Sequence, residues 1–404
     1  MERKRKRRSC LFVCILFGAG ILVGGAAVGI IEGNRGAQTG YLMQSQDGVF
    51  TGQDFVPFDK ILKLDGYKKA KADNVEFCYE KKKPEIRITA DMEKMLIQKN
   101  EYTFSASEAV VYDGELYVPR EEMEQLLGMN ISGDEKSGYS LEEQSVKAHA
   151  WTSSEVPLIA HAAGGFLEQQ ADGQRVQHTY TNAREPFVES YNKGFRVIEM
   201  DFQMSKDGVL CALHGWKDFG GKMNSDEFAK VKVDGQYTTM TMEDVLRGLS
   251  VNRDLYLVTD MKSYKWSDKK VKKRYREIYD MAVEYGGEQL ADRIIPQIYE
   301  QSEYDIIKEV YNWSSIIYTL YKAGEVTNEE VVSFVEEKDD IPVVTVPQGR
   351  VSLEFSELLH DAGKMVYTHT INDTDNLYEW MNKGVDGFYT DTMTPSGYLA
   401  RYGS

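Results

Sequence analysis

Short apolar runs alternate with helical stretches from Val156 to the C-terminus, and this regularity constrains the fold more than any other feature. Such alternation is typical of a parallel sheet whose strands are joined by right-handed crossover helices. The region is also close to the roughly 250 residues of a typical (β/α)8 barrel. We therefore predict an α/β fold, a (β/α)8 TIM barrel over residues 156–404. Its eight strands are expected at 157–161, 196–202, 254–262, 293–299, 315–321, 341–346, 365–371 and 386–391.

The stretch FRVIEMDFQM places two carboxylates, Glu199 and Asp201, inside an apolar strand. Side chains two residues apart on a strand share a face, so both carboxylates are expected to point into the barrel. The turn signal KDG at 206–208 predicts that residues 210–215 fold back antiparallel onto this strand. That hairpin would carry His214 toward the end of the strand.

Polar residues at the carboxyl ends of the strands would gather at one mouth of the barrel, where the functional groups of this fold lie. Asp260 and Lys262 share a face there, as Glu199 and Asp201 do. Three converging carboxylates repel one another, and oxygen ligands suit hard cations. We therefore expect a divalent cation, Ca²⁺ or Mg²⁺, unless lysine or arginine side chains inside the barrel pair with the carboxylates instead. The residues at the strand ends are His161, Glu199, Asp201, Asp260, Lys262, Gln297 and His369, and the hairpin adds His214.

The segments LIAHAAGG, YTNAREPFVESYNKGFRVIEMDFQMSKDGVLCALHGW, LYLVTDMK and VYTHTINDTDNLYEWMNKGVDGFYTD resemble the glycerophosphodiester phosphodiesterase family. This family belongs to the phosphatidylinositol-phospholipase-C-like barrels, and the resemblance spans essentially all of residues 156–395. It implies a phosphoric diester hydrolase that converts a glycerophosphodiester, or a related phospholipid-derived substrate, to an alcohol and a glycerol phosphate.

The resemblance also implies roles for single residues. His161 and His214 would form the acid/base pair, and Lys262 would contact the phosphate. Asn182 matches the asparagine of a family motif, and His369 stands where the family often has an aromatic residue, so packing or substrate stacking is as open to it as proton transfer. Glu199, Asp201 and Asp260 would be the metal ligands. Asn182 and His369, together with Gln297 from the strand ends, would complete the substrate-binding set.

Asp260 stands where the family has a glutamate, and two further positions depart from the family pattern. Ala162 replaces an arginine, which removes a bidentate phosphate clamp, and Thr181 replaces a glutamate that would bind the metal. The alternative to an enzyme is therefore a weak or inactive barrel that binds a phosphorylated lipid headgroup or cell-wall polymer. A third hypothesis is a structural role in the envelope, carried by the N-terminal part of the chain.

The N-terminus predicts a membrane anchor. A basic tail at residues 1–9 precedes an uncharged apolar span at 10–31, long enough to cross a bilayer. Basic residues before a span favour a cytoplasmic N-terminus, so we expect a single-pass protein of the cell membrane with extracellular C-terminal domains. A cleaved signal peptide is the alternative, although its apolar region is usually shorter.

Between the span and the barrel we expect a linker at 32–74, a small α+β unit at 75–135 and a second linker at 136–155. The unit resembles, through YDGELYVPREEMEQLLGM, the stalk domain named after the N-terminal part of copper amine oxidases, which implies a spacer or a contact with the cell wall. No histidine or cysteine in it has the spacing of metal ligands. The chain carries a net charge of −16, which argues against nucleic acid as a partner.

Overall fold

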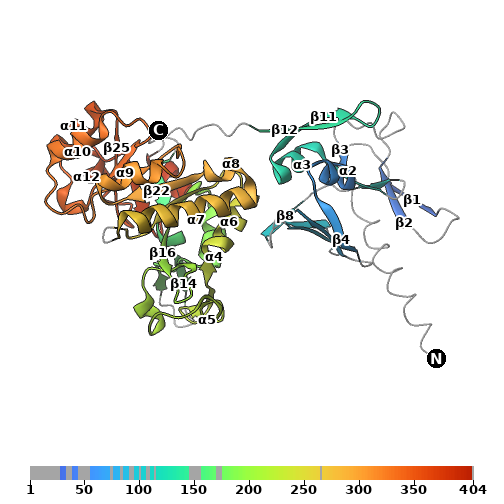
Figure 1. Ribbon diagram of the computed structural model, residues 1–404, viewed down its shortest axis with the longest axis horizontal. Helices are drawn as coiled ribbons and strands as arrows, with labels where there is room; N and C mark the ends of the chain where they lie inside the picture. Colours follow the sequence, from blue (N-terminus) through green and yellow to red (C-terminus); the bar gives the residue numbers. More distant parts are fainter. Residues whose placement is uncertain are drawn as a thin grey trace. The chain divides into compact units, whose positions relative to one another are not determined.

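A computed structural model gives the fold of the chain. It describes residues 28–32, 39–43, 55–72, 76–81, 85–90, 95–99, 102–105, 110–112, 115–144, 156–169, 175–263 and 266–402. The chain divides into two compact units, Met1–Ser145 and Val146–Ser404, shown from blue to red in Figure 1. Each unit has its own core and is described by itself.

The second unit is a closed parallel barrel, as predicted. Its hydrogen-bonded order is β13-β26-β25-β24-β23-β22-β21-β16, and β13 also pairs with β16, which closes the ring. All eight predicted strands are confirmed. They are β13 (Leu158–Ala160), β16 (Val197–Met204), β21 (Tyr256–Asp260), β22 (Ile294–Ile298), β23 (Ile317–Thr319), β24 (Val343–Thr345), β25 (Met365–Thr368) and β26 (Gly387–Thr390).

Helices connect these strands, and their apolar faces lie against the barrel. In α7 the buried residues recur every three or four positions, so its basic and acidic side chains occupy the solvated face. The helices are α4 (Arg184–Asn192), α6 (Met242–Val251), α7 (Asp268–Gly286), α8 (Glu288–Ala291), α9 (Gln301–Lys308), α10 (Asn328–Val335), α11 (Leu353–Asp361), α12 (Leu377–Met381) and α13 (Pro395–Tyr402).

The alternation of side chains along the strands explains where the polar residues go. The inner layer of the barrel is an apolar cluster that includes Val197, Val258 and Ile295. Residues two positions further along a strand face the same way, so β16 turns Glu199 and Asp201 inward at its carboxyl end. The barrel therefore has an apolar interior closed by a polar mouth.

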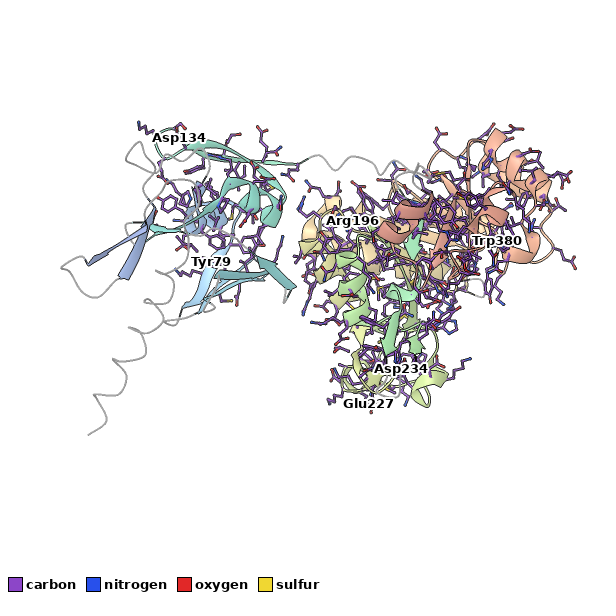
Figure 2. All side chains as sticks on the ribbon, turned by 180° about the vertical axis from the view of Figure 1, so that it is seen from behind. Tyr79, Asp134, Arg196, Glu227, Asp234 and Trp380 are labelled. Atoms are coloured by element: carbon purple, nitrogen blue, oxygen red, sulfur yellow. The ribbon has the colours of Figure 1, made fainter. Side chains whose placement is uncertain are left out.

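The predicted hairpin is confirmed. β17 (Leu210–Ala212) pairs antiparallel with β16, and β20 (Met240–Thr241) extends this edge. A lobe projects beside the barrel in Figure 1, formed by the β14–β15 hairpin (Phe166–Gln169 and Arg175–His178) together with α5 (Ser225–Phe228) and its neighbours. Figure 2 places Glu227 and Asp234 on this lobe.

The described residues of the first unit form short antiparallel sheets and two helices. The predicted strand–helix segment is confirmed. Helix α3 (Arg120–Leu127) is followed by Gly128, whose φ of 71° suits the left-handed position after a helix. Its elements are β1 (Val28–Glu32), β2 (Thr39–Met43), β3 (Phe55–Pro57), α2 (Phe58–Leu64), β4 (Lys68–Ala72), β5 (Glu76–Glu80), β6 (Glu85–Ala90), β7 (Met95–Lys99), β8 (Tyr102–Ser105), β9 (Val110–Tyr112), β10 (Glu115–Pro119), α3 (Arg120–Leu127), β11 (Met129–Asp134) and β12 (Gly138–Glu143).

The structure corrects the prediction of two linkers. Residues 55–64, inside the linker expected at 32–74, form β3 and α2, and β3 pairs with β10. Phe58, Ile61 and Leu62 are fully buried in the core of the unit, because their spacing gives α2 one apolar face. The linker expected at 136–155 likewise contains β12, which pairs with β11. Charged residues on the outer face of α2 give this stretch the polar composition on which the linker prediction rested.

This correction predicts a measurable loss of stability. Leu62→Ala should destabilise the first unit by about 2–5 kcal/mol, the usual cost of a leucine-to-alanine cavity. Urea melts of the full chain, followed by circular dichroism and by tyrosine and tryptophan fluorescence, should show an earlier transition for the first unit only. Leu64→Ala is the matched control, because Leu64 lies on the same helix and is 52% exposed. Equal, negligible effects of both variants would mean that α2 does not belong to a packed core.

The predicted apolar span at 10–31 lies outside the described residues except for its last four, which belong to β1. Among the helices that the structure describes, none combines the length and the apolar character needed to cross a bilayer. The basic tail at 1–9 also lies outside the described residues.

Candidate functional site

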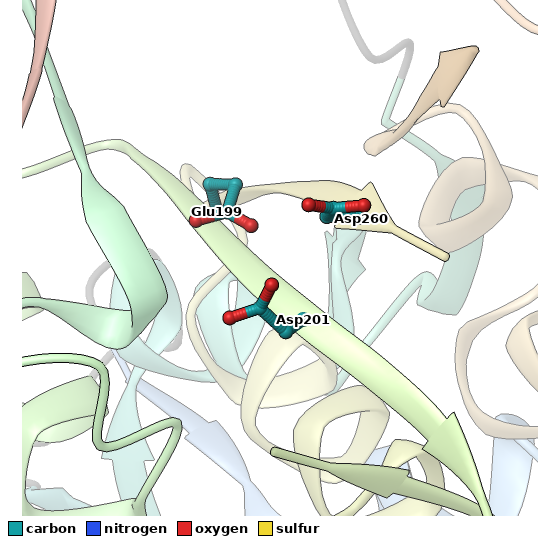
Figure 3. A group of neighbouring side chains, drawn as sticks. All are labelled: Glu199, Asp201 and Asp260. Atoms are coloured by element: carbon teal, nitrogen blue, oxygen red, sulfur yellow. The ribbon is translucent and has the colours of Figure 1, made fainter. Parts of the chain in front are cut away.

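Three carboxylates meet at the carboxyl ends of two neighbouring strands (Figure 3). β16 carries Glu199 and Asp201, and β21 places Asp260 directly opposite Asp201 in the strand register. One ligand atom from each carboxylate lies within 4.8 Å of the other two. The side chains are nearly inaccessible, at 2%, 2% and 7% of their full exposure. The structure thus brings together the three residues that the sequence predicts as metal ligands.

These carboxylates carry more negative charge than their surroundings balance. The Lys262 ammonium lies 2.6 Å from Asp201 Oδ1 and 3.6 Å from Asp260 Oδ2, so it pairs with two of the three carboxylates. Burial, together with the charge of Asp201, raises the pKa of Glu199 to about 8. Burial also raises the pKa of Asp260. Burial opposes ionisation of Asp201 as well, yet the Lys262 ammonium keeps its pKa below the ordinary value.

Hydrogen bonds hold the carboxylates in place. The Asn182 amide donates to Asp201 Oδ2 at 2.9 Å and accepts from the Asp201 backbone N–H at 2.9 Å. Asn182, predicted to bind substrate, is therefore fully buried against Asp201. The Tyr299 hydroxyl donates to Asp260 Oδ1 at 2.7 Å, and the backbone N–H of Ala162 donates to Glu199 Oε2 at 2.8 Å.

The donor set suits a hard divalent cation. Carboxylate oxygens are the ligands that Ca²⁺ and Mg²⁺ prefer, and a cation among them would offset the burial and the repulsion from Asp201 that together raise the pKa of Glu199. The residues present therefore fit the cation that the sequence predicts, with Glu199, Asp201 and Asp260 as the available ligands.

His161 is oriented by a chain of two hydrogen bonds. Its Nδ1 lies 2.9 Å from Asp391 Oδ1, and the Asn372 amide donates to Asp391 Oδ2 at 2.8 Å. Burial of the imidazole lowers its pKa, but the hydrogen bond to Asp391 and the negative charges of Glu199, Asp391 and Asp201 together outweigh burial, so the net pKa of His161 is raised. Because Nδ1 is engaged, the Nε2 edge of the ring is the one left for a ligand.

Tyr180 joins the two predicted acid/base histidines. Its ring centroid lies 4.7 Å from that of His161 and 5.1 Å from that of His214, both edge to face. His161 follows β13 and His214 follows β17, so the hairpin brings them to the same ring. Two imidazoles, one of them backed by a carboxylate, can therefore transfer protons at one place in the mouth.

The remaining predicted residues line the same mouth. Gln297 accepts a hydrogen bond from the Tyr389 hydroxyl at 3.2 Å. His369 lies between the rings of Tyr321 and Tyr389, with centroid distances of 5.4 and 5.7 Å. Burial lowers the pKa of His369 to about 4, so its imidazole is neutral at physiological pH.

One of the departures from the family pattern, Ala162, lies in left-handed backbone. Ala162 and Ala163 follow His161 with φ angles of 49° and 71°, a left-handed conformation that is uncommon for residues other than glycine. Strained backbone of this kind clusters at functional sites. Here it aims the Ala162 N–H at Glu199, so this position contributes a backbone donor rather than the expected arginine side chain.

Four residues of this site were not predicted from the sequence: Asp391, Asn372, Tyr299 and Tyr180. Asp391 lies two positions after the interior residue Tyr389, so the rule that found Glu199 applies to it as well. Tyr299 likewise lies two positions after Gln297 and directly follows β22, which ends at Ile298. No local signal marks Asn372 or Tyr180, because both lie in connections after strands.

Comparisons with known proteins identify the family and the fold. A model of the glycerophosphoryl diester phosphodiesterase family matches residues 173–394. A structure from Galdieria sulphuraria assigned as a glycerophosphodiester phosphodiesterase is similar in fold, with a TM-score of 0.50 and 15% identity over 62% of this chain and 98% of that one.

Similarity extends to two further glycerophosphodiester phosphodiesterase structures. That from Parabacteroides distasonis has a TM-score of 0.46 and 18% identity, over 58% of this chain and 92% of that one. That from Thermotoga maritima has a TM-score of 0.41 and 21% identity, over 58% and 94%. None of the curated proteins matches this chain.

Proposed function

The chain belongs to the glycerophosphoryl diester phosphodiesterase family and is a phosphoric diester hydrolase, and from this premise we propose that it hydrolyses a glycerophosphodiester, with the help of a divalent cation, on the outer side of a membrane. The products are an alcohol and a glycerol phosphate. One observation carries the proposal: two histidines and three buried carboxylates converge at a single mouth of the barrel.

The carboxylates supply the cation site. Glu199, Asp201 and Asp260 would hold Ca²⁺ or Mg²⁺, and such a cation polarises phosphoryl oxygens and lowers the pKa of a hydroxyl nucleophile. Asn182 positions Asp201 through two hydrogen bonds. Lys262 balances part of the carboxylate charge and is available to contact the substrate phosphate, because its side chain remains 23% exposed.

The histidines move the protons. One imidazole removes the proton of the attacking hydroxyl, and the other protonates the leaving alkoxide. Asp391 holds the His161 ring in one orientation and stabilises its protonated form. The attacking hydroxyl is either water or the glycerol hydroxyl of the substrate itself, which would give a cyclic phosphate before water completes the reaction.

A turnover assay tests the proposal. The purified chain, treated with a chelator and then given Ca²⁺ or Mg²⁺, should release glycerol phosphate from glycerophosphodiesters only in the presence of cation. Release that is equally fast in the chelator would reject the cation. Absence of release with every substrate and cation would favour the second candidate, a binding barrel.

The second candidate rests on a specific observation. Thr181 and Ala162 replace side chains that would bind metal and phosphate, and the Thr181 hydroxyl is buried without a partner among the described residues. Such a barrel would bind a phosphorylated lipid headgroup or cell-wall polymer without cleaving it. Calorimetric binding of glycerophosphodiesters without turnover would distinguish it from the enzyme.

For the location we propose a single-pass protein of the cell membrane, supported by the basic tail at 1–9 and the uncharged stretch at 10–31. The first unit would act as a stalk or as a contact with the cell wall. Protease added to intact cells should digest residues 36–404. Protection of these residues, or their complete release into the medium, would contradict an anchor with an outward barrel.

A further inference from the structure

A row of aromatic and imidazole rings lies in the barrel mouth. From Tyr180 it passes through His161, Tyr389 and His369 to Tyr321, with successive centroid distances of 4.7, 6.5, 5.7 and 5.4 Å. The middle of this ring row is buried, since Tyr389 is 2% exposed. Its two ends are not, because Tyr180 is 44% and Tyr321 is 53% exposed.

The proposed reaction uses the Tyr180 end, where both histidines meet, and leaves the Tyr321 end without a role. Tyr321 follows β23 at the carboxyl ends of the strands, the face on which functional groups of this fold lie. An exposed ring in that position is available to whichever substituent the phosphodiester carries next to its reacting phosphate. The Tyr321 end is therefore a candidate for the alcohol portion of the substrate.

The charges around this end select the kind of alcohol. The Lys322 ammonium lies 4.7 Å from the Tyr321 ring centroid, so a positive charge already occupies this ring. His369 is neutral, which leaves one donor and one acceptor nitrogen on its ring. A second cation, such as a quaternary ammonium, would meet repulsion there. A neutral ring with many hydroxyls can place its C–H face on the tyrosine and bond its hydroxyls to the imidazole, the phenol and the ammonium.

We propose that Tyr321, Lys322 and His369 form the subsite for the alcohol of the phosphodiester, and that this alcohol is a neutral polyhydroxylated ring, such as a sugar or a cyclitol. The assignment rests on the proposed function, because it places the subsite next to the proposed catalytic histidines. It adds a substrate class that the carboxylates and the histidines do not specify.

A comparison of kcat/KM for two soluble esters tests the subsite. The full chain with cation should have a kcat/KM for glycerophosphoinositol at least about tenfold above that for glycerophosphocholine, within the range that one subsite contact supplies. Tyr321→Ala should remove about tenfold from the glycerophosphoinositol value, chiefly through KM, and should change the glycerophosphocholine value little. Tyr321→Phe should retain most of the preference, because it keeps the ring.

A matched control is available elsewhere on the surface. Tyr378 is 58% exposed, and its ring packs against Tyr402 rather than joining the ring row. Tyr378→Ala should therefore leave both kinetic values unchanged. A preference for glycerophosphocholine, or equal losses with both esters in Tyr321→Ala, would overturn the subsite.

Failure of the proposed function is distinguishable from failure of the subsite. If neither ester is cleaved, the hydrolase proposal fails, and calorimetry with glycerophosphoinositol then decides the subsite alone. Binding that is lost in Tyr321→Ala and kept in Tyr378→Ala would support the subsite. Binding that is absent, or equal in the two variants, would reject it.

Discussion

Replacing His161 or His214 with alanine is expected to lower the turnover number for a glycerophosphodiester by about 10²–10⁴-fold each, the usual contribution of a positioned acid or base. Both imidazoles pack against the Tyr180 ring, so we expect one bound phosphate to lie within reach of both. The combined loss in the double variant should be smaller than the product of the single losses, because residues that act as a unit are not additive. Steady-state kinetics at saturating substrate and cation measure these losses.

Three further measurements make this prediction specific. Asp391→Asn should cost less than His161→Ala, because it leaves the imidazole present but removes the carboxylate that stabilises its protonated form. Asp391→Asn should also lower the apparent pKa of His161 in the pH–rate profile, which a purely structural change would not do. His369→Ala should affect turnover far less, since His369 contacts only rings of the mouth among the interactions described. Folded single variants with wild-type turnover would contradict the histidine pair.

The sequence allowed the barrel and the carboxylates to be predicted together, because both follow from the alternation of side chains along a strand. Val197 faces the interior, so Glu199 and Asp201 on the same strand must face it as well. The KDG turn fixed the direction of the following segment and thereby the approach of His214. Local patterns of two or three residues were enough for these inferences.

Contacts between distant segments were not predictable in this way. The bond from Asn372 to Asp391 joins a loop to a strand end 19 residues later, and no local pattern specifies such a pair. The family motif predicts that Asn182 binds substrate, but it does not reveal that the Asn182 amide donates one hydrogen bond to Asp201 and accepts another from it. The linker prediction at 55–64 failed for a different reason, since the apolar face of α2 is only three residues wide among charged neighbours.

The second large effect concerns the cation. Glu199→Gln or Asp201→Asn should weaken the binding of Ca²⁺ or Mg²⁺ by at least tenfold, or about 1.4 kcal/mol, because each removes one of three charged ligands. Isothermal titration at pH 8 measures the affinity directly. Glu337→Gln, at an exposed position, is the matched control and should bind the cation as the unchanged chain does. Unchanged affinity in both site variants would reject these carboxylates as ligands.

The cation-free protein should reveal the same repulsion through its stability. Burial and the neighbouring Asp201 raise the pKa of Glu199 from 4.5 to about 8, so between these pH values the folded state holds a proton that the unfolded state has released. Stability therefore falls as pH rises from about 4.5 to about 8, by an amount on the order of a few kcal/mol. Glu199→Gln has no such proton and should flatten this slope.

Added cation should then act most strongly where the repulsion is greatest. Glu199 loses its proton as the pH approaches its pKa of about 8. A cation that binds only the folded state raises its stability in proportion to the logarithm of its concentration over Kd. Thermal melts at pH 5 and pH 8, with chelator and with Ca²⁺ or Mg²⁺, should show the larger rise in Tm at pH 8. In Glu199→Gln the difference between the two pH values should shrink. A rise in Tm that is the same at both pH values and in both proteins would place the cation elsewhere on this acidic chain.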